Sequence, residues 1–261
     1  MPIDFHATRN HRSYADRQAD STWRDFMRAL ITIEGKDIAD IGCGGGIYTA
    51  AFADMGAAHV TGVDFSETML QDAREQCSGY DTVSFQQGDA LHTGLADAHF
   101  DVILERGLTH HLKQEQLPAC FAEAYRLLRP GGVLFVQNRT PEDCQLPGSD
   151  TNPRGYFFEK FPRLLTIETS RRPNSVTTMA ALQQAGFTRI EERHLWEIKE
   201  VYPNIEKLTE HILTRKGRSI LHELTDTELQ ELAEYIRERY SDQQGEIVEQ
   251  CRWTVWCAWK A

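Results

Sequence analysis

The feature that most constrains the fold of this chain is a short apolar strand pattern that runs into a cluster of glycines and then into a helix pattern. The apolar stretch Ile38–Ile41 leads to Gly42–Gly46, and Ile47–Met55 follows with helical character. Glycine adopts positive φ and lets a ligand approach the backbone closely. A helix that begins there offers unpaired N–H groups and the positive end of its dipole. This turn predicts a site for a nucleotide-like ligand or a carboxylate.

Strand and helix patterns alternate along much of the chain. Besides the strand Asp37–Ile41, strand character is found at His59–Val63, Val83–Gln86, Phe100–Leu104, Val133–Gln137, Ile190–Trp196 and Val248–Lys260. Further helical patterns stand at 11–31, Ser66–Gln76, Leu117–Leu128, Ser175–Ala185 and 204–240. Strands that alternate with helices form parallel βαβ units whose sheet is covered on both faces. We therefore expect an α/β fold with a doubly wound, Rossmann-like, mostly parallel sheet of seven strands and helices on both faces.

The segment 140–175 departs from this alternation. It contains five of the nine prolines and the aromatic cluster Tyr156–Phe161, which predicts a long, shaped connection. Long connections are often functional. We expect residues 1–261 to form a single domain. Its core would comprise about 37–140, 175–200 and 247–261, and a helical lid or cap would comprise about 1–31, 141–174 and 201–245.

Charge and composition disfavour several classes of partner. The chain has 28 Lys and Arg against 39 Asp and Glu, a net charge of −11. Nucleic acids and anionic membranes both favour basic surfaces, so neither is an expected partner. The start of the chain, Met1–Asn10, lacks the apolar run of a secretory signal, and no stretch approaches the roughly 20 apolar residues of a membrane span. These observations predict a cytoplasmic protein; its oligomeric state stays open.

Cysteine and histidine spacing indicates neither disulfides nor a metal site. The six cysteines include no C-x-x-C pair, which is typical of reduced thiols. The ten histidines are scattered apart from His110 and His111, and adjacent side chains point apart, so this pair makes a poor chelate.

The spacing of the glycines narrows the choice of ligand. A dinucleotide fingerprint has the form G-x-G-x-x-G, but Ile47 stands where its third glycine would be. The chain instead has G-x-G-x-G at Gly42, Gly44 and Gly46, and Asp40 stands two residues before the first glycine.

Two further acidic residues follow predicted strands. Asp64 stands 22 residues after Gly42, at the end of the second strand, where a carboxylate accepts hydrogen bonds from ribose hydroxyls. Phe65 and Met69 are placed to sandwich an adenine ring. After the third strand, Asp89 can accept from the exocyclic amine of adenine while the amide of Ala90 donates to a ring nitrogen.

These segments, taken in order, resemble the class I S-adenosylmethionine (SAM)-dependent methyltransferases, in the broad group of small-molecule methylases. The matching segments are Asp40–Gly46, Val63–Asp64, Gly88–Ala90, Phe100–Leu104 followed by His110–Leu112, and Leu128–Gly132. The resemblance covers about residues 37–137. It implies SAM as the cofactor, S-adenosylhomocysteine (SAH) as the product, and a small-molecule methyl acceptor.

The resemblance also implies roles for individual residues. The loop glycines pass close to the methionine part of SAM, and Asp40 holds that loop or the SAM amino group. Asp64 binds the ribose, and Glu105 lies beside the cofactor. The full set of predicted cofactor-binding residues is Asp40, Gly42, Gly44, Gly46, Asp64, Phe65, Met69, Asp89, Ala90 and Glu105. Glu105 and Arg106 are more charged than is usual in this family, which indicates a site that handles a polar or charged group.

The residues for the acceptor and for catalysis are less constrained. Candidate acceptor-binding residues are Tyr14, Arg106, His111, Arg171 and Arg172. His111 and Tyr14 are also the candidate catalytic residues, although a histidine that leads into a helix more often packs or caps. Arg171 and Arg172 either clamp an anionic acceptor or are solvated.

The chemistry explains the lack of a catalytic triad. Methyl transfer from a sulfonium is an in-line displacement with a neutral leaving group. The enzyme supplies mainly positioning, worth up to roughly 7–11 kcal/mol in favourable cases. A general base is needed only where the acceptor must lose a proton. The alternatives are a methyltransferase that acts on a protein or RNA, a SAM-binding protein without catalysis, and an NAD(P) oxidoreductase.

Overall fold

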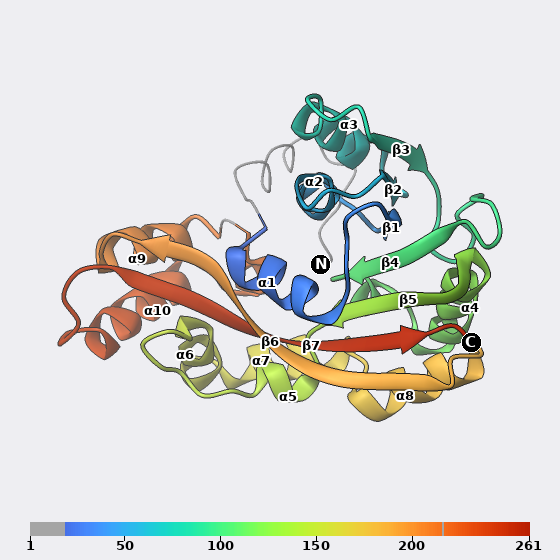
Figure 1. Ribbon diagram of the computed structural model, residues 1–261. Coiled ribbons are helices and arrows are strands. Elements are labelled where there is room, and N and C mark those ends of the chain that lie inside the picture. Colours follow the sequence, from blue (N-terminus) through green and yellow to red (C-terminus); the bar gives the residue numbers. More distant parts are fainter. Residues whose placement is uncertain (1–18, 216) are drawn as a thin grey trace. The chain divides into compact units, whose positions relative to one another are not determined.

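The computed structural model describes residues 19–215 and 217–261 (Figure 1). Its strands are β1 (Asp37–Ile41), β2 (His59–Asp64), β3 (Val83–Gln87), β4 (Phe100–Arg106), β5 (Leu128–Asn138), β6 (Arg189–Tyr202) and β7 (Ile247–Trp259). Its α-helices are α1 (Ser21–Leu30), α2 (Ile47–Asp54), α3 (Glu67–Gln76), α4 (Leu117–Leu127), α5 (Pro141–Cys144), α6 (Pro153–Lys160), α7 (Pro162–Ser170), α8 (Ser175–Gln184), α9 (Ile205–Leu213) and α10 (Asp226–Arg239). Short 3-10 helices are η2 (Thr109–His111), η3 (Gln114–Gln116) and η4 (Ser219–Glu223).

The seven strands form one sheet in the order β3-β2-β1-β4-β5-β7-β6. β1 pairs in parallel with β2 and β4, β2 with β3, and β4 with β5, whereas β7 runs antiparallel to β5. The predicted doubly wound, mostly parallel sheet of seven strands is confirmed. The strand order reverses direction between β1 and β4, and ligands of open α/β sheets bind beyond the carboxyl ends of the strands at such a point.

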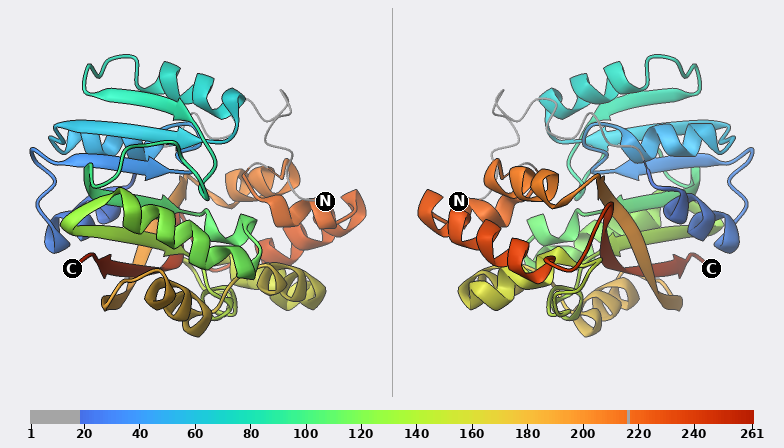
Figure 2. Two further views of the ribbon diagram at one scale, coloured as in Figure 1. Left: turned by 90° about the vertical axis from the view of Figure 1, so that its right-hand side faces the viewer. Right: turned by 90° about the vertical axis from the view of Figure 1, so that its left-hand side faces the viewer.

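Helices cover both faces of the sheet because side chains along each strand point alternately to opposite faces. Val102 and Leu104 of β4 pack in the apolar cluster that includes residues of α1 and α2. Ile103, between them, packs in the cluster that includes residues of α4 and α8. The side views show the same arrangement, with the blue α1 on one side of these strands and the green α4 on the other (Figure 2).

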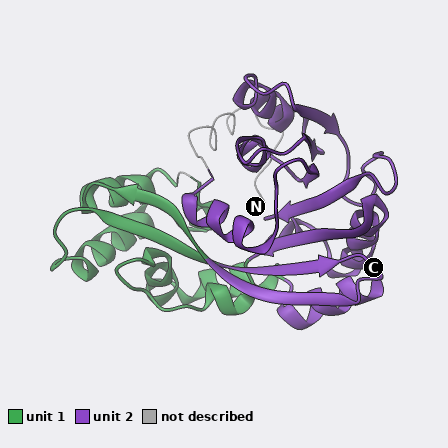
Figure 3. Ribbon diagram, in the orientation of Figure 1, with its two compact units in different colours: residues 1–3, 139–172, 196–252 green, residues 4–138, 173–195, 253–261 purple. Residues whose placement is uncertain are grey.

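The described chain divides into two compact units (Figure 3). Unit 2 contains residues 19–138, 173–195 and 253–261, and so holds β1 to β5 and both clusters just described. Unit 1 contains residues 139–172 and 196–252. It has an apolar core of its own, which includes Phe157 of α6, Leu208 of α9 and Leu232 of α10. The long strands β6 and β7 contribute residues to both units.

The segment 140–175 connects β5 to α8, as expected, and it is helical instead of an irregular loop, because it contains α5, α6 and α7. The physical reason lies in its prolines. Pro141, Pro153 and Pro162 each stand at the start of a helix. Proline lacks a backbone N–H, but at the first turn of a helix that N–H would have no intrahelical acceptor. The fixed φ of proline already suits a helix. The prolines therefore mark helix starts instead of loop.

The other element boundaries agree with the predicted ones to within a few residues, with four differences. β5 and β6 are longer than predicted, and the helical pattern over 204–240 contains two helices, α9 and α10. α1 begins at Ser21, because Ala19 and Asp20 are not helical; residues 11–18 of that helix pattern lie outside the described residues. α10 begins with a capping box: Thr225 Oγ1 accepts from Glu228 N at 3.3 Å, and the Glu228 carboxylate accepts from Thr225 N at 2.9 Å. Of the described helices, none has the length and apolarity needed to cross a bilayer.

Candidate functional site

The glycine loop between β1 and α2 has a backbone that only glycine adopts without strain. Gly42, Gly44 and Gly46 have φ of +75°, +53° and +81°. Gly42 N donates to Val63 O at 2.7 Å, which ties the loop to β2. A Cβ on Gly46 would lie 3.1 Å from Ala73 of α3, whereas a Cβ on Gly44 would have no described atom within 4 Å. Gly46 therefore permits close packing, and Gly44 borders open space.

Asp64, the last residue of β2, holds this loop in place. One carboxylate oxygen accepts from Gly44 N at 2.9 Å and the other accepts from Ser66 N at 2.9 Å. The side chain is buried at 6% exposure. A carboxylate offers about four acceptor positions, more than these two amides use. Asp64 therefore joins the ends of β1 and β2 through backbone amides and has the chemistry to accept from hydroxyl groups.

Asp40 and Arg106 lie on the face of the sheet that α2 covers. Thr49 Oγ1 donates to the Asp40 carboxylate at 2.7 Å. Burial raises the pKa of Asp40 to about 6, against the hydrogen bond from Thr49 and the charge of Arg106, which lower it. The Arg106 guanidinium lies 4.1 Å from the ring centre of Tyr48 and 4.3 Å from that of Trp253. Stacking between two aromatic rings holds this cation at the carboxyl end of β4.

Glu105 is the neighbour of Arg106 on β4, so its side chain points to the opposite face, under α4. It is fully buried, and its Oε1 accepts from Cys120 Sγ at 3.6 Å. Its Oε2 has no hydrogen-bond partner within the described part of the chain. Burial raises the pKa of Glu105 to about 7. The side chains of Glu105 and Asp40 lie on opposite faces of the sheet, so the two do not form one site here. A contact of Glu105 with the cofactor stays a prediction.

The predicted adenine-binding residues follow the ends of β2 and β3. Asp89 is exposed, and its Oδ1 accepts from Leu91 N at 2.8 Å. Ala90 is half-buried. Phe65 presents a large apolar surface at 51% exposure, whereas Met69 of α3 is buried at 5%. A carboxylate and an exposed ring thus stand at adjacent strand ends; their roles in binding stay predictions.

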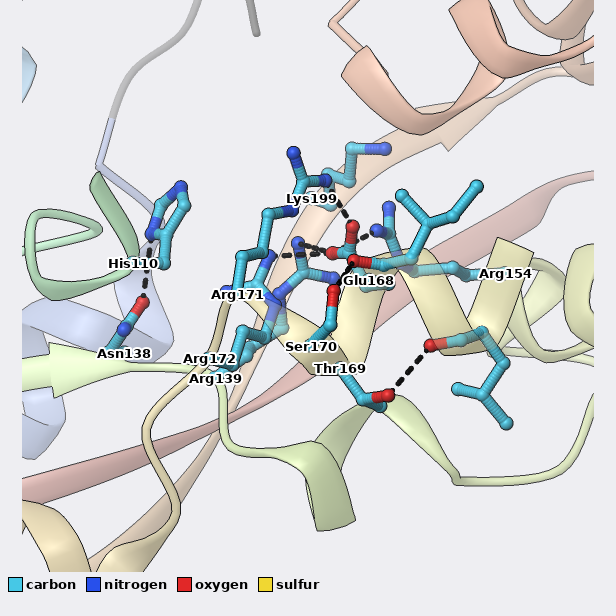
Figure 4. A network of polar contacts seen from close by, with 12 residues as sticks. His110, Asn138, Arg139, Arg154, Glu168, Thr169, Ser170, Arg171, Arg172 and Lys199 are labelled. Carbon is cyan, nitrogen blue, oxygen red and sulfur yellow. Dashed lines mark hydrogen bonds and ion pairs between the residues drawn. The ribbon is translucent and has the colours of Figure 1, made fainter. Parts of the chain in front are cut away.

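The two histidines after β4 differ in their surroundings. His110 Nδ1 lies 3.2 Å from Asn138 Oδ1 (Figure 4). Asn138 Nδ2 donates to Thr109 Oγ1. His111 is exposed, with its ring centre 3.9 Å from that of His110. Asn138 is a polar residue of this site that the sequence did not reveal, since it meets His110 only through the pairing of β4 with β5. Tyr14, the other candidate, lies outside the described residues.

Arg171 and Arg172 lie in unit 1, around the carboxylate of Glu168 (Figure 4). The Arg172 side chain is only 3% exposed and that of Arg171 is 33% exposed. The alternative that both are solvated is therefore wrong for Arg172. Whether they bind the acceptor stays a prediction.

The structure contains neither disulfides nor an assembled metal site in the residues that it describes. All six cysteines are buried free thiols, Cys251 and Cys257 both on β7. No group of three or more His, Cys, Asp or Glu side chains in 19–215 and 217–261 is arranged to hold a metal ion.

Comparison with known proteins identifies the family. A family model for a methyltransferase domain matches residues 38–132. Demethylmenaquinone methyltransferase of Clavibacter sepedonicus is 30% identical over 193 residues, which cover 67% of this chain and 76% of that protein. Phosphoethanolamine N-methyltransferase of Triticum aestivum is 29% identical over 171 residues, which cover 64% of this chain but 30% of the plant enzyme.

A solved structure gives the same fold. Haemonchus contortus phosphoethanolamine N-methyltransferase 2, in complex with phosphomonomethylethanolamine and SAH, has a TM-score of 0.58 and 18% identity. The similarity covers 99% of this chain and 61% of that one, so it supports the fold and no more. The bacterial relative, three-quarters of whose length is matched, shows the family. This chain belongs to the class I SAM-dependent methyltransferases.

Proposed function

We propose that the protein transfers a methyl group from SAM to a small-molecule acceptor by in-line displacement. Two observations support a small acceptor. The relatives are named for small acceptors, demethylmenaquinone in one case and phosphoethanolamine in the other. The net charge of −11 disfavours a nucleic acid.

The residues at the carboxyl ends of β1 to β3 fit SAM. The observation on which this proposal depends most is that the Asp64 carboxylate binds the amide of Gly44 at 2.9 Å and is itself a strong acceptor. One residue thereby fixes the loop and offers oxygens for the ribose hydroxyls. Gly44 borders open space, as a loop that receives the methionine part of the cofactor requires. Asp89 and the exposed ring of Phe65 supply the two kinds of contact that adenine needs.

The chain mainly binds and orients. SAM, when bound, supplies a methyl group already activated on a sulfonium. In our proposal, Asp64 accepts from the ribose, Asp89 accepts from the adenine amine, and Asp40 holds the start of α2 through Thr49. No strong base is required for the displacement itself. Where an acceptor must lose a proton, His110 is the better candidate than the exposed His111, because Asn138 fixes one of its ring nitrogens.

We further propose that unit 1 supplies the acceptor-binding cap. The chain enters unit 1 directly after Asn138, the last residue of β5, and the loops after the strands of such sheets build ligand sites. Unit 1 has its own apolar core, so it can present a shaped surface and is not a flexible tether. Hydrogen exchange with and without SAH tests this: added protection in 139–172 as well as in the glycine loop is expected, and protection in the loop alone would reject the cap.

The acceptor class is tested with SAM labelled on its methyl carbon. The purified protein is incubated with a metabolite extract, with total tRNA and with a protein extract in separate reactions. Label is expected in the low-molecular-weight fraction. Label confined to RNA or protein would replace the small molecule by a macromolecular acceptor, and SAH binding without transfer in any reaction would indicate a non-catalytic SAM-binding protein.

A further inference from the structure

Unit 1 contains a cluster in which four arginines surround one carboxylate. Glu168 of α7 lies 2.6 Å from Arg154, 2.6 Å from Arg172 and 3.6 Å from Arg139, and it also pairs with Arg171. In Figure 4 these guanidinium groups point toward Glu168 from α6, from the end of α7 and from the residue that follows β5. We call this set the arginine cluster. All five residues belong to unit 1.

The arginine cluster is buried and has excess positive charge. The side chains of Arg139, Arg154 and Arg172 are 15%, 11% and 3% exposed, and that of Glu168 is 1% exposed. Two neighbouring buried acids have cationic partners outside the cluster: Asp143 pairs with Arg252 at 2.5 Å, and Glu249 pairs with Lys199 and Arg218. The charge of Asp143 also acts on Arg139. Within the described residues, Glu168 is the carboxylate that all four arginines share, and positive charge is in excess around it.

The pKa values of Arg172, Arg154 and Glu168 reflect this excess. The pKa of Arg139 is raised instead: burial lowers it, but the neighbouring thiols and the carboxylates of Glu168 and Asp143 outweigh burial. Burial, reinforced by the charge of Arg139, lowers the pKa of Arg172 to about 10. Burial also lowers the pKa of Arg154, and again Arg139 contributes. The four arginine charges hold the pKa of Glu168 far below its usual range in spite of burial. An ion pair that served only to join α6 to α7 would need one arginine, and each added buried cation opposes folding.

The guanidinium groups also retain donors. The Nε groups of Arg154, Arg171 and Arg172 are buried and donate to no acceptor in the part of the chain that the structure describes. Guanidinium presents a planar fork of donors that matches the oxygens of phosphate and carboxylate groups. A second anion beside Glu168 would accept these hydrogen bonds and reduce the excess positive charge.

We propose that the arginine cluster binds the phosphate or carboxylate group of the methyl acceptor. This inference rests on the proposed function, since it names the chemistry of the acceptor. The anionic group serves as a handle that fixes the small molecule, and the reacting nucleophile lies elsewhere on it. Arg139, Arg154, Arg171 and Arg172 are the binding residues, and Glu168 keeps their side chains directed to one point.

The test is calorimetric titration of the full chain with inorganic phosphate and, separately, with succinate, at constant ionic strength in chloride. Saturable binding of at least one probe is expected, and the tighter one distinguishes a phosphate handle from a carboxylate handle. Arg171→Gln changes the most exposed member of the cluster and should weaken that binding about tenfold or more. Arg163→Gln is the matched control, because Arg163 is also on α7 but forms an exposed ion pair with Glu228. The Arg163→Gln variant should bind the same probe with the affinity of the wild type.

The result that would overturn the site is no saturable binding of either probe, or equal binding by the Arg171→Gln and Arg163→Gln proteins. A measurement on the wild type alone guards against a misfolded variant: the tighter probe should slow hydrogen exchange in 139–172 relative to chloride, and unchanged exchange would reject the site. SAH titration of the same samples separates the two hypotheses. SAH binding without anion binding rejects the arginine site alone, whereas a wild-type chain that does not bind SAH rejects the proposed function and the acceptor assignment with it.

Discussion

The two units each contain a fully buried glutamate, and the two are stabilised in opposite ways. Glu105, in unit 2, has a thiol as its hydrogen-bond partner and, among the described residues, no cation beside it, and burial raises its pKa to about 7. Glu168, in unit 1, has four arginines, and their charges lower its pKa. A buried carboxylate without a cation prefers the neutral form, and one among cations stays ionised. The difference shows that the interior of unit 1 around α7 stabilises an ionised carboxylate, whereas the face of β4 under α4 favours a neutral one.

The same substitution should therefore have opposite effects on stability in the two units. Glu168→Gln leaves four arginines without their shared anion and should lower the free energy of unfolding by about 3–5 kcal/mol. Chemical denaturation monitored by circular dichroism measures this. The control is Glu210→Gln, which removes an exposed carboxylate paired with Lys207 on α9 and should cost less than about 1 kcal/mol. Equal effects of the two substitutions would show that the arginine cluster does not depend on Glu168.

Glu105→Gln should stabilise the protein, and only at the higher pH. The folded state binds the Glu105 proton more tightly than the unfolded chain does, because its pKa is raised from 4.5 to about 7. The cost of burial grows as pH rises through this window and reaches roughly 3 kcal/mol above it. Denaturation at pH 8 should show the variant as the more stable protein, and at pH 4.5 the gain should vanish. A gain of the same size at both values would mean that Glu105 does not titrate in the folded state.

Asp64 and the glycine loop act together in ligand binding, in our proposal. Asp64→Ala removes the acceptor that binds the Gly44 and Ser66 amides and, in our proposal, the ribose. Each charged hydrogen bond lost should cost about 1.5–3 kcal/mol of SAH affinity. Calorimetry checks this, with Asp101→Ala at the start of β4, the other end of the strand, as the control. Unchanged SAH affinity in Asp64→Ala would show that another residue holds the ribose.

The smallest expected effect is that of a glycine substitution, and it distinguishes the strain of a positive φ from a role of Gly44 in binding. Gly44→Ala and Gly35→Ala both place a Cβ where φ is positive, at +53° and +72°, with open space around it. Both should lose about 1–2 kcal/mol of stability, the usual cost of the left-handed conformation. Only Gly44→Ala should also weaken SAH binding, by about tenfold, because its Cβ enters the space beside the loop. A matching loss of SAH affinity in Gly35→Ala would attribute the effect to global destabilisation.

How far the sequence predicts this molecule differs between the units for a physical reason. The strand–loop–helix pattern at Ile38–Met55 and the helix pattern that starts at Ser66 are local in sequence, so glycine spacing and apolar periodicity predicted the sheet of unit 2. Ser66 Oγ indeed accepts from Met69 N at 3.4 Å at the start of α3.

Unit 1 depends on contacts that no short pattern encodes. Pro153 and Pro162 are compatible with a loop or with a helix start, and only the tertiary structure decides. Glu168 meets Arg154 and Arg139, which are 14 and 29 residues away in the chain and belong to different elements. The sequence shows that Arg171 and Arg172 are adjacent, but it does not show that both form ion pairs with Glu168. The link between His110 and Asn138 was missed for the same reason.

The central claim is that the glycine loop and Asp64 hold SAM in place of a dinucleotide. The most direct measurement is calorimetric titration of the wild-type chain with SAH, with SAM and with NAD under one set of conditions. We predict saturable binding of SAH and SAM and none of NAD. Because a ligand at 100 times its Kd stabilises a fold by about 2.7 kcal/mol, SAH and SAM should also raise the melting temperature and NAD should not. Binding of NAD without binding of SAH or SAM would contradict the account.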